Sequence, residues 1–375
     1  MLLAGLRIVE VSSFVAAPLA GLTLAQLGAE VIRVDPIGGT PDRTRWPLAP
    51  TGVSLYWAGL NRGKTSIEAD LASDEGRDLV HRLLVDPAGG ILVTNAGGRG
   101  WLADAELRRV RADLIHVQIS GTHDGRTAVD YTVNAAVGFP AVTGAEGGAD
   151  PVNHVLPAWD VSCGLYAATA ILAADRRRSH TGEGALLTIA LEDVALATAS
   201  NLGLLAEAEL AGAGRPRIGN HLYGGFARDF ATVDGGRIMI VTLTPRHWQD
   251  LVALTGIGDV ARSIEAAHGA DLRRDADRYA HRLAIAAAIE PWFAQRTVDD
   301  AASALETTSI VWSRYGMFVD QVTASNGIAA NPLFALVDDP GIGRVHAAGS
   351  PIVEQGSSRP PAQPAPRPGS GVAPC

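Results

Sequence analysis

Residues 6–35, LRIVEVSSFVAAPLAGLTLAQLGAEVIRVD, decide the fold of this chain. Residues 6–11 and 30–35 are two apolar runs of the near-continuous kind that buried parallel strands have. Between them, Pro18 suits the first turn of a helix and Gly28 suits its end. The order of strand, helix and strand predicts a Rossmann-like unit. Its turn, SSFVAAP, lacks the G-x-G-x-x-G pattern of dinucleotide sites, although its small alanines would let another ligand reach the helix N-terminus.

The same alternation of strands and helices continues over the first half of the chain. Further buried strands are expected at residues 65–71, 91–95, 114–120 and 185–191. Helices are expected at residues 73–84, 104–111, 160–178 and 192–210. This order predicts an α/β fold with a parallel sheet covered on both faces. Ligands of such sheets bind at the carboxyl ends of the strands, where this chain carries Ser12, Asp35, Asn95 and Ser120.

Three parts of the chain are expected to form two domains. Residues 1–210 are predicted to be most of a large Rossmann-like domain. A Gly-rich linker then opens a smaller α+β domain over residues 211–325, with strands at 236–243 and 309–314 and helices at 245–256 and 272–306. Residues 326–375 are expected to return to the large domain. They end, from Gly356, in an extended Ser/Pro/Gly-rich tail to which we assign no function.

One acid stands where a loop meets a predicted helix, in PVNHVLPAWDVSCGLYAATAILAADRRR (residues 151–178). Asp160 is predicted to lie at or near the N-cap, where its carboxylate would accept backbone N–H bonds. Capping alone would explain it, but its neighbours are apolar, and a carboxylate in such a setting can be a positioned nucleophile. His154, on the same loop, is a second candidate for the site. Cys163 has apolar neighbours and is interpreted as a small core residue.

Composition excludes several classes of function. With 375 residues, 47% hydrophobic and 19% charged, the chain can bury a sizeable core, and its net charge of −9 argues against nucleic acid or an anionic membrane as a partner. Two cysteines, Cys163 and Cys375, provide no disulfide framework and no Cys-rich metal site. The absence of a G-x-S-x-G motif disfavours an α/β-hydrolase, and because no H-E-x-x-H or C-x-x-C motif occurs we expect no metal. The N-terminus lacks signal-peptide features and no apolar run is long enough to span a bilayer, so the cytoplasm is the expected location.

Several stretches, in the same order along the chain, resemble the class III CoA-transferase family, the CaiB/BaiF type. They are residues 3–39, 55–71, 91–95 and 130–144, the Asp160 helix, and its closing turn HTGEG at 180–184. The resemblance runs to about Ala199 and resumes near residues 329–366. It implies a large domain built from both chain ends, a small domain between them, and an interlocked homodimer in which each subunit is threaded through the other.

The resemblance also implies roles for individual residues, with Asp160 as the catalytic residue. Contacts to CoA or substrate are expected from Val15, Ala16, Ala69, Asp70, Leu71, Asn95, Ala96, Arg99, Asp130 and Tyr131. The family has Phe where this chain has Ala96. Many members also have a basic residue where this chain has Pro36, so contacts to the CoA nucleotide are expected from Arg33, Arg43 or Arg45. We add His154 because it shares a loop with Asp160.

Within the family, further stretches resemble members that move CoA between the two carboxyl groups of mesaconyl-CoA. They are residues 45–47, 112–115, 129–134, 152–160, 219–230, 290–293 and 331–344. The expected chemistry is covalent: the Asp160 carboxylate forms an anhydride and then an aspartyl-CoA thioester, with backbone N–H groups at the start of its helix stabilising the oxyanions. No cofactor is expected beyond the CoA of an acyl-CoA substrate.

Three other functions stay open at this point. An intermolecular class III CoA-transferase, acting between an acyl-CoA and a free carboxylic acid, would use the same aspartate. An α-methylacyl-CoA racemase would want a His-Asp pair where this chain has Val129 and Asp130, so racemisation is disfavoured. A non-catalytic CoA-binding protein would not need Asp160, which makes it the weakest alternative.

Overall fold

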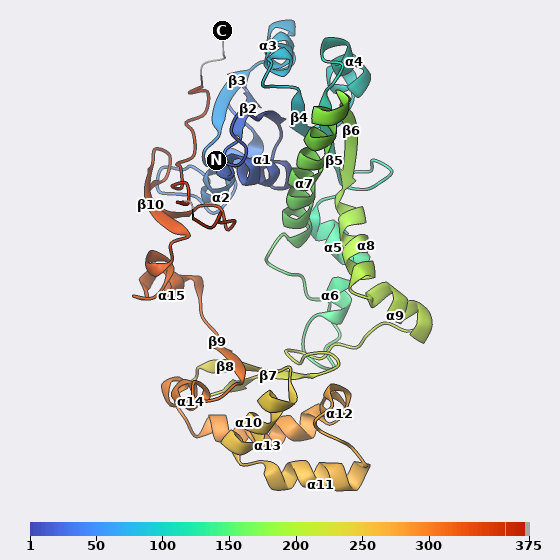
Figure 1. Cartoon of the computed structure of the whole chain (residues 1–375), viewed down its shortest axis with the longest axis vertical. Coiled ribbons are helices and arrows are strands. Elements are labelled where there is room, and N and C mark those ends of the chain that lie inside the picture. The colour runs from blue at the N-terminus through green and yellow to red at the C-terminus, as the bar shows by residue number, and fades with distance from the viewer. Residues whose placement is uncertain (357, 372–375) are drawn as a thin grey trace. The chain divides into compact units, whose positions relative to one another are not determined.

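The structure is a computed structural model that describes residues 1–356 and 358–371 (Figure 1). Cys375 lies outside the described residues. The chain forms two compact units, one from residues 1–138, 153–210 and the segment from 322 onward, and one from residues 139–152 and 211–321. The sequence analysis had placed residues 139–152 in the first domain. They join the second unit because Arg217 donates hydrogen bonds to the carbonyls of Ala141 and Gly148, and Arg282 forms an ion pair with Glu146.

A six-stranded sheet of entirely parallel strands forms the centre of the first unit, which confirms the predicted α/β fold. The strands are β1 (Arg7–Val11), β2 (Glu30–Pro36), β3 (Thr65–Ala69), β4 (Ile91–Thr94), β5 (Ile115–Ser120) and β6 (Ala185–Ala190). Their order is β3-β2-β1-β4-β5-β6. The chain reverses direction across the sheet between β1 and β4, and ligands bind at such a switch point, beyond the carboxyl ends of the strands.

Helices cover the sheet. The helices of the first unit and the 3-10 turns η1 to η3 are α1 (Ala16–Gln26), η1 (Pro41–Thr44), α2 (Leu55–Leu60), α3 (Asp74–Val85), η2 (Gly100–Leu102), α4 (Asp104–Val110), α5 (Asp130–Val137), α7 (Ala158–Thr181), α8 (Leu191–Asn201), α9 (Leu204–Ala211) and η3 (Ile328–Ala330). As predicted, Ser73 caps α3 by accepting the N–H of Gly76. Helices α1 and α7 lie side by side (Figure 1). A side chain at Gly164 of α7 would come within 2.7 Å of the Ala16 carbonyl, so only glycine permits this packing.

The long helix predicted over residues 192–210 is wrong. The structure has two helices, α8 and α9, bent by 66° at a break before Leu204. Gly203 adopts φ of 78° there, which a helix cannot continue through. In the described part of the chain no single helix is both long and apolar enough to cross a bilayer, and the bent α8–α9 pair meets that test by length and composition only.

The second unit has its own antiparallel sheet and helical core. Its strands are β7 (Phe226–Ala231), β8 (Arg237–Thr242) and β9 (Val311–Arg314), in that order. Its helices are α6 (Phe139–Val142), α10 (Pro245–Thr255), α11 (Gly258–His268), α12 (Asp275–Ala280), α13 (Arg282–Ala294) and α14 (Val298–Leu305), while α15 (Phe318–Thr323) leads back to the first unit. Buried side chains such as Phe226, Ile240 and Phe293 form its core. The sequence analysis missed β7 and α11.

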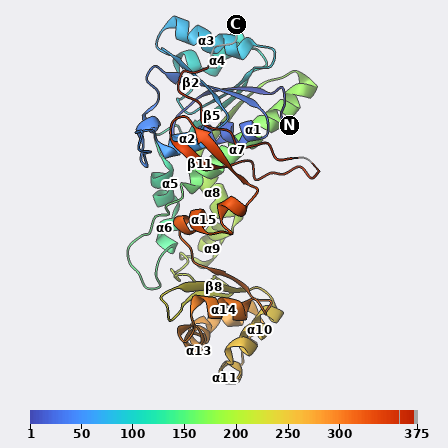
Figure 2. The same ribbon diagram turned by 90° about the vertical axis from the view of Figure 1, so that its left-hand side faces the viewer.

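The C-terminal segment packs on the first unit. A hairpin of β10 (Phe334–Asp339) and β11 (Gly343–Ala348) comes first (Figure 2). Beyond it, the N–H of Ala365 donates to the buried carboxylate of Asp339, and the N–H of Gly371 donates to the Ser66 carbonyl at the free edge of β3. Within the described residues, the tail is therefore hydrogen-bonded to the fold.

Candidate active site

A cavity of about 600 Å³ lies at the carboxyl ends of β1, β4 and β5. Its lining is made of residues 14–16 after β1, 95–97 after β4, 119–121 at the end of β5, 125–131 in the loop and first turn of α5, Pro157 and Asp160 at the start of α7, and Arg45 and Leu191. This is the switch point of the sheet, where the topology predicts a ligand. The residues predicted from the sequence that line this cavity are Val15, Ala16, Arg45, Asn95, Ala96, Ser120, Asp130, Tyr131 and Asp160.

The loop after β1 is held by hydrogen bonds from neighbouring elements. Phe14 has φ of 64°, a left-handed conformation that is uncommon for a bulky side chain. Its N–H donates to the Asp42 carboxylate at 2.9 Å. The Asn95 side chain accepts the N–H of Ser13 at 3.0 Å and donates to the Ser13 carbonyl at 2.8 Å. Asn95 therefore fixes the backbone that presents Val15 to the cavity.

A buried network of charges lies beneath this loop and includes Arg33. Its guanidinium is fully buried and donates to Glu10 at 3.1 Å, to Asp35 at 2.8 Å and to the Ser12 carbonyl at 2.9 Å. Arg33 therefore does not line the cavity, and the prediction that it contacts the CoA nucleotide is corrected. The sequence placed it on a buried strand, but the acids of neighbouring strands that would engage it could not be identified before the sheet order was known.

Lys64, the only lysine of the chain, completes this network. Its ammonium lies 2.8 Å from the second carboxylate oxygen of Glu10, and burial lowers its pKa to about 8. Burial also raises the pKa of Asp35 to about 6, although Arg33 opposes that shift. The network ties β1, β2 and the segment before β3 together under the loop that shapes the cavity.

Asp160 is the third residue of α7, near the N-cap as predicted, but its side chain does not cap the helix. The cap is Asp130, whose carboxylate accepts the N–H of Trp159 at 2.7 Å and the N–H of Asp160 at 3.2 Å. These two N–H groups are consequently not available to stabilise an oxyanion, which corrects that expectation. Because Asp130 caps the helix, the Asp160 carboxylate makes no capping hydrogen bond to the helix backbone.

The Asp160 carboxyl has a raised pKa. Burial is the main cause, the buried Asp130 carboxylate adds to it, and Arg45 opposes it, so that the pKa is about 6. At neutral pH the group is ionised but poorly solvated, which suits a nucleophile. Cys163 lies fully buried one turn later, and burial raises the pKa of its thiol to about 12, so it stays protonated. It is the core residue that the sequence indicated.

His154 is brought to Asp130 by the fold. Its Nε2 lies 3.0 Å from the Asp130 carboxylate, and its ring lies 6.4 Å from that of Tyr131 and 6.1 Å from that of Trp159. The sequence argument against a racemase assumed that no histidine accompanies Asp130, because residue 129 is valine. Residue 129 is valine, as that argument states, but the structure brings a histidine to Asp130 from another loop.

Two groups at or beside the cavity, Arg45 and Tyr56, carried little signal in the sequence. Arg45 was predicted only as a contact of the CoA nucleotide, yet it lines the cavity that contains Asp160. Tyr56 of α2 was not predicted. Burial raises the pKa of Tyr56, with Arg45 opposing and Asp160 adding to the shift, so these three groups share one electrostatic environment. The sequence signals that could have identified them are the tripeptides RWP at residues 45–47 and LYW at residues 55–57. Neither tripeptide is a motif that indicates a particular chemistry.

The remaining predicted residues lie elsewhere. Arg43 pairs with Glu68 at 3.1 Å and lines a separate cavity of about 490 Å³. Ala69 is buried at the end of β3, and Asp70 accepts the N–H of Ala72 in the turn before α3. Neither Leu71 nor the exposed Arg99 lines the Asp160 cavity. The roles proposed for these residues at the nucleotide end of CoA stay predictions.

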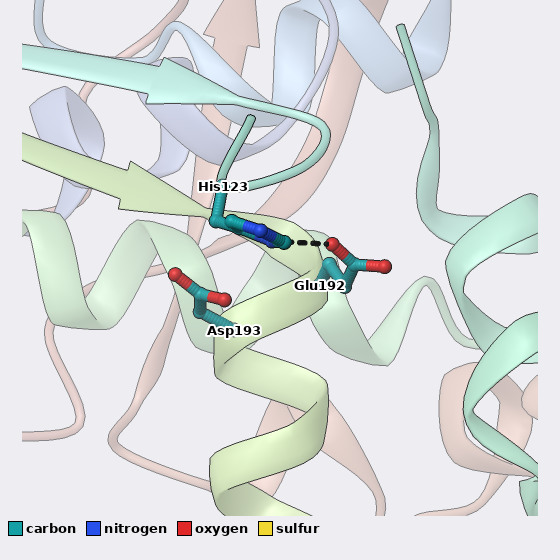
Figure 3. A group of neighbouring side chains, drawn as sticks. All are labelled: His123, Glu192 and Asp193. Carbon is teal, nitrogen blue, oxygen red and sulfur yellow. Dashed lines mark hydrogen bonds and ion pairs between the residues drawn. The ribbon is translucent and has the colours of Figure 1, made fainter. Parts of the chain in front are cut away.

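One group of potential metal ligands lies near the site. Figure 3 shows His123, Glu192 and Asp193, whose ligand atoms lie within 4.8 Å of one another. His123 and Asp193 are exposed, and both acids occupy the first turn of α8, where they complement the positive end of the helix. Glu192 also pairs with His123 at 3.2 Å. These roles account for the group without a metal ion.

Comparison with known proteins identifies the family and the fold. The model of CoA-transferase family III matches residues 3–371. The chain is 47% identical over 370 residues to 2-methylfumaryl-CoA isomerase of Chloroflexus aurantiacus, covering 98% of this chain and 90% of that protein. It is 28% identical over 350 residues to succinate–glutarate CoA-transferase of Agrobacterium fabrum, covering 87% and 84%. A CaiB/BaiF family protein from Brucella suis superposes with a TM-score of 0.81 at 25% identity, covering 98% and 96%.

Proposed function

Because the chain belongs to CoA-transferase family III, we propose that it is an enzyme that moves CoA between the two carboxyl groups of 2-methylfumaryl-CoA, also called mesaconyl-CoA. The observation that carries the proposal is the Asp160 carboxylate, part-buried in the cavity at the switch point and released from helix capping by Asp130. The similarity to 2-methylfumaryl-CoA isomerase supports the choice of substrate.

The first half of the reaction moves CoA onto the enzyme. An Asp160 oxygen attacks the thioester carbonyl of the substrate, the C–S bond breaks, and CoA leaves as the thiolate. The product is a mixed anhydride between Asp160 and the acyl group. The thiolate then attacks the Asp160 carbonyl carbon, the anhydride C–O bond breaks, and an aspartyl-CoA thioester and a free dicarboxylate remain.

The second half returns CoA to the other end of the same molecule. The second carboxylate attacks the aspartyl carbonyl and expels the thiolate, which then attacks the substrate carbonyl of the new anhydride and frees Asp160. No proton is gained or lost in the sequence, and we propose that no cofactor is needed beyond the CoA of the substrate. The N-terminus of α1 has no side-chain cap and reaches the cavity at Val15 and Ala16, so its N–H groups can stabilise the oxyanions.

Two alternatives have distinct outcomes. An intermolecular transferase would release the first acid and accept another, using the same Asp160 steps. A racemase gains one specific observation, the contact of His154 with Asp130. Racemisation would exchange the α-proton of a 2-methylacyl-CoA with solvent, so deuterium incorporation in D₂O would identify it.

We also propose that the protein acts as an interlocked homodimer in the cytoplasm. Phe318 of the second unit is 95% exposed beside exposed Met317, and α7 of the first unit leaves Leu165 and Tyr166 half exposed. Exposed apolar side chains of this size commonly mark an interface. Light scattering of the purified protein tests the assembly: twice the chain mass supports it, and a single chain mass contradicts it.

The proposed function is tested by incubating the protein with mesaconyl-C1-CoA and following the C4 isomer by chromatography. The wild-type protein should form the C4 isomer without added acid, while Asp160→Asn should form none. Hydroxylamine added during turnover should convert the aspartyl thioester to a hydroxamate, which peptide mass spectrometry would locate at residue 160. Isomer formation that survives in Asp160→Asn would contradict the mechanism.

A further inference from the structure

Arg45 is a cation of the active-site cavity without an acidic partner. It follows η1, where its N–H donates to the Asp42 carbonyl. Its guanidinium lies over the ring of Tyr56, 4.8 Å from the centroid, and 5.9 Å from the centroid of Phe14. Among the described residues it has no ion pair and no side-chain hydrogen bond. The aromatic faces hold the group in place while its five N–H donors stay available.

The neighbouring arginines are all engaged. Arg33 is buried against Glu10 and Asp35, and Arg43 pairs with Glu68. Arg126, which also lines the cavity, pairs with Asp124 at 2.7 Å. Arg45 is therefore the arginine near Asp160 that keeps its full capacity for an anion.

The anion must come from the ligand. The acids that line the cavity are Asp130 and Asp160. Asp130 is occupied by two backbone N–H groups and His154, and Asp160 is the nucleophile. A guanidinium binds a carboxylate in a bidentate manner, which fixes both its position and its orientation. The CoA phosphates are separated from the thioester by the whole pantetheine arm, so a cation beside Asp160 faces the acyl end of the substrate.

We propose that Arg45 binds the carboxylate of the substrate that is not joined to CoA, and so selects CoA monoesters of dicarboxylic acids. The inference rests on the proposed function and names the residue that gives it its specificity. While CoA is on Asp160, Arg45 retains the free dicarboxylate in the cavity. The same contact allows the two carboxylates to exchange places, because either one can occupy the guanidinium while the other meets the aspartyl thioester.

The test compares Arg45→Gln and Arg45→Lys with the wild-type protein. A hydrogen bond to a charged group is worth about 1.5–3 kcal/mol, which predicts a loss of about 10- to 150-fold in kcat/KM for mesaconyl-C1-CoA in Arg45→Gln. Arg45→Lys should recover part of that loss, since it restores the charge but not the bidentate geometry. Arg109→Gln is the matched control, because Arg109 is an exposed arginine of α4 that lies outside the cavity.

Two further measurements distinguish a loss of carboxylate binding from a general structural effect of the Arg45 substitution. Hydroxamate trapping at Asp160 with crotonyl-CoA, which has no second carboxylate, should change less than threefold in Arg45→Gln. Uptake of labelled free mesaconate into the CoA ester should rise in Arg45→Gln, because the dicarboxylate escapes. If the wild-type protein isomerises and Arg45→Gln keeps its kcat/KM within threefold, Arg45 does not bind the carboxylate and the proposed function stands. If the wild-type protein does not isomerise, the proposed function itself fails.

Discussion

Replacing Asp160 by Asn should stabilise the protein while abolishing turnover. Burial and the Asp130 carboxylate raise the pKa of Asp160 from 3.8 to about 6. Because the folded pKa is the higher one, folding favours the protonated acid, and stability is lost as the pH rises through the folded pKa. The shift of about two pKa units corresponds to about 3 kcal/mol above pH 7. The side-chain amide of the Asp160→Asn variant cannot ionise, so its folded state is not destabilised by a buried charge at this position.

The assay is urea unfolding of both proteins at pH 7.5 and at pH 4. The gain of Asp160→Asn should approach 3 kcal/mol at pH 7.5 and fall to about 0.5 kcal/mol at pH 4, where the folded carboxyl is protonated. Asp150→Asn is the matched control, because Asp150 is exposed, and it should change stability equally little at both pH values. Equal stability of Asp160→Asn and the wild-type protein at pH 7.5 would refute the view that the Asp160 carboxylate is held in a desolvated site.

Three further predictions follow from the same contacts. Lys64→Met should lower the free energy of unfolding by about 3–5 kcal/mol, because one oxygen of the buried Glu10 carboxylate loses its cation while Arg33 pairs with the other oxygen, and adding Glu10→Gln should recover part of the loss in denaturant titrations. A pH profile of kcat/KM should fall about tenfold per unit below pH 6, since attack needs the ionised Asp160, and a flat profile down to pH 4.5 would contradict this role. Asn95→Ala should lower kcat/KM by up to about 30-fold, because two hydrogen bonds of about 1 kcal/mol each to Ser13 are lost, and a change below twofold would show that the loop needs no such support.

In the first unit, the sequence correctly predicted those helices and strands that depend only on residues close together in the chain. The apolar runs of β1 and β2 and the Ser73 cap of α3 each depend on neighbouring residues, and all three are confirmed. The continuous helix across residues 192–210 failed because helical periodicity on both sides of Gly203 outweighed one glycine. Strand β7 was missed because it begins directly after the Gly-rich linker and has charged residues within it.

The site was predictable in outline only. Asp160 could be recognised, but its role as a cap could not be excluded, since the true cap, Asp130, lies 30 residues away in the sequence. The sequence does not distinguish Arg33 from Arg45. In the structure, Arg33 pairs with buried acids, whereas Arg45 has no acidic partner among the described residues and can bind a ligand. Only the three-dimensional positions of the surrounding acids distinguish them.

The most direct test of the central claim is a crossover measurement. Mesaconyl-C1-CoA is incubated with the wild-type protein and an excess of ¹³C-labelled free mesaconate, and the C4 isomer is analysed by mass spectrometry. Transfer within one substrate molecule predicts a C4 isomer that is formed fully and carries no label. Label in the C4 isomer at the proportion of the free acid would show that the dicarboxylate leaves the cavity, and would contradict intramolecular transfer while leaving Asp160 as the nucleophile.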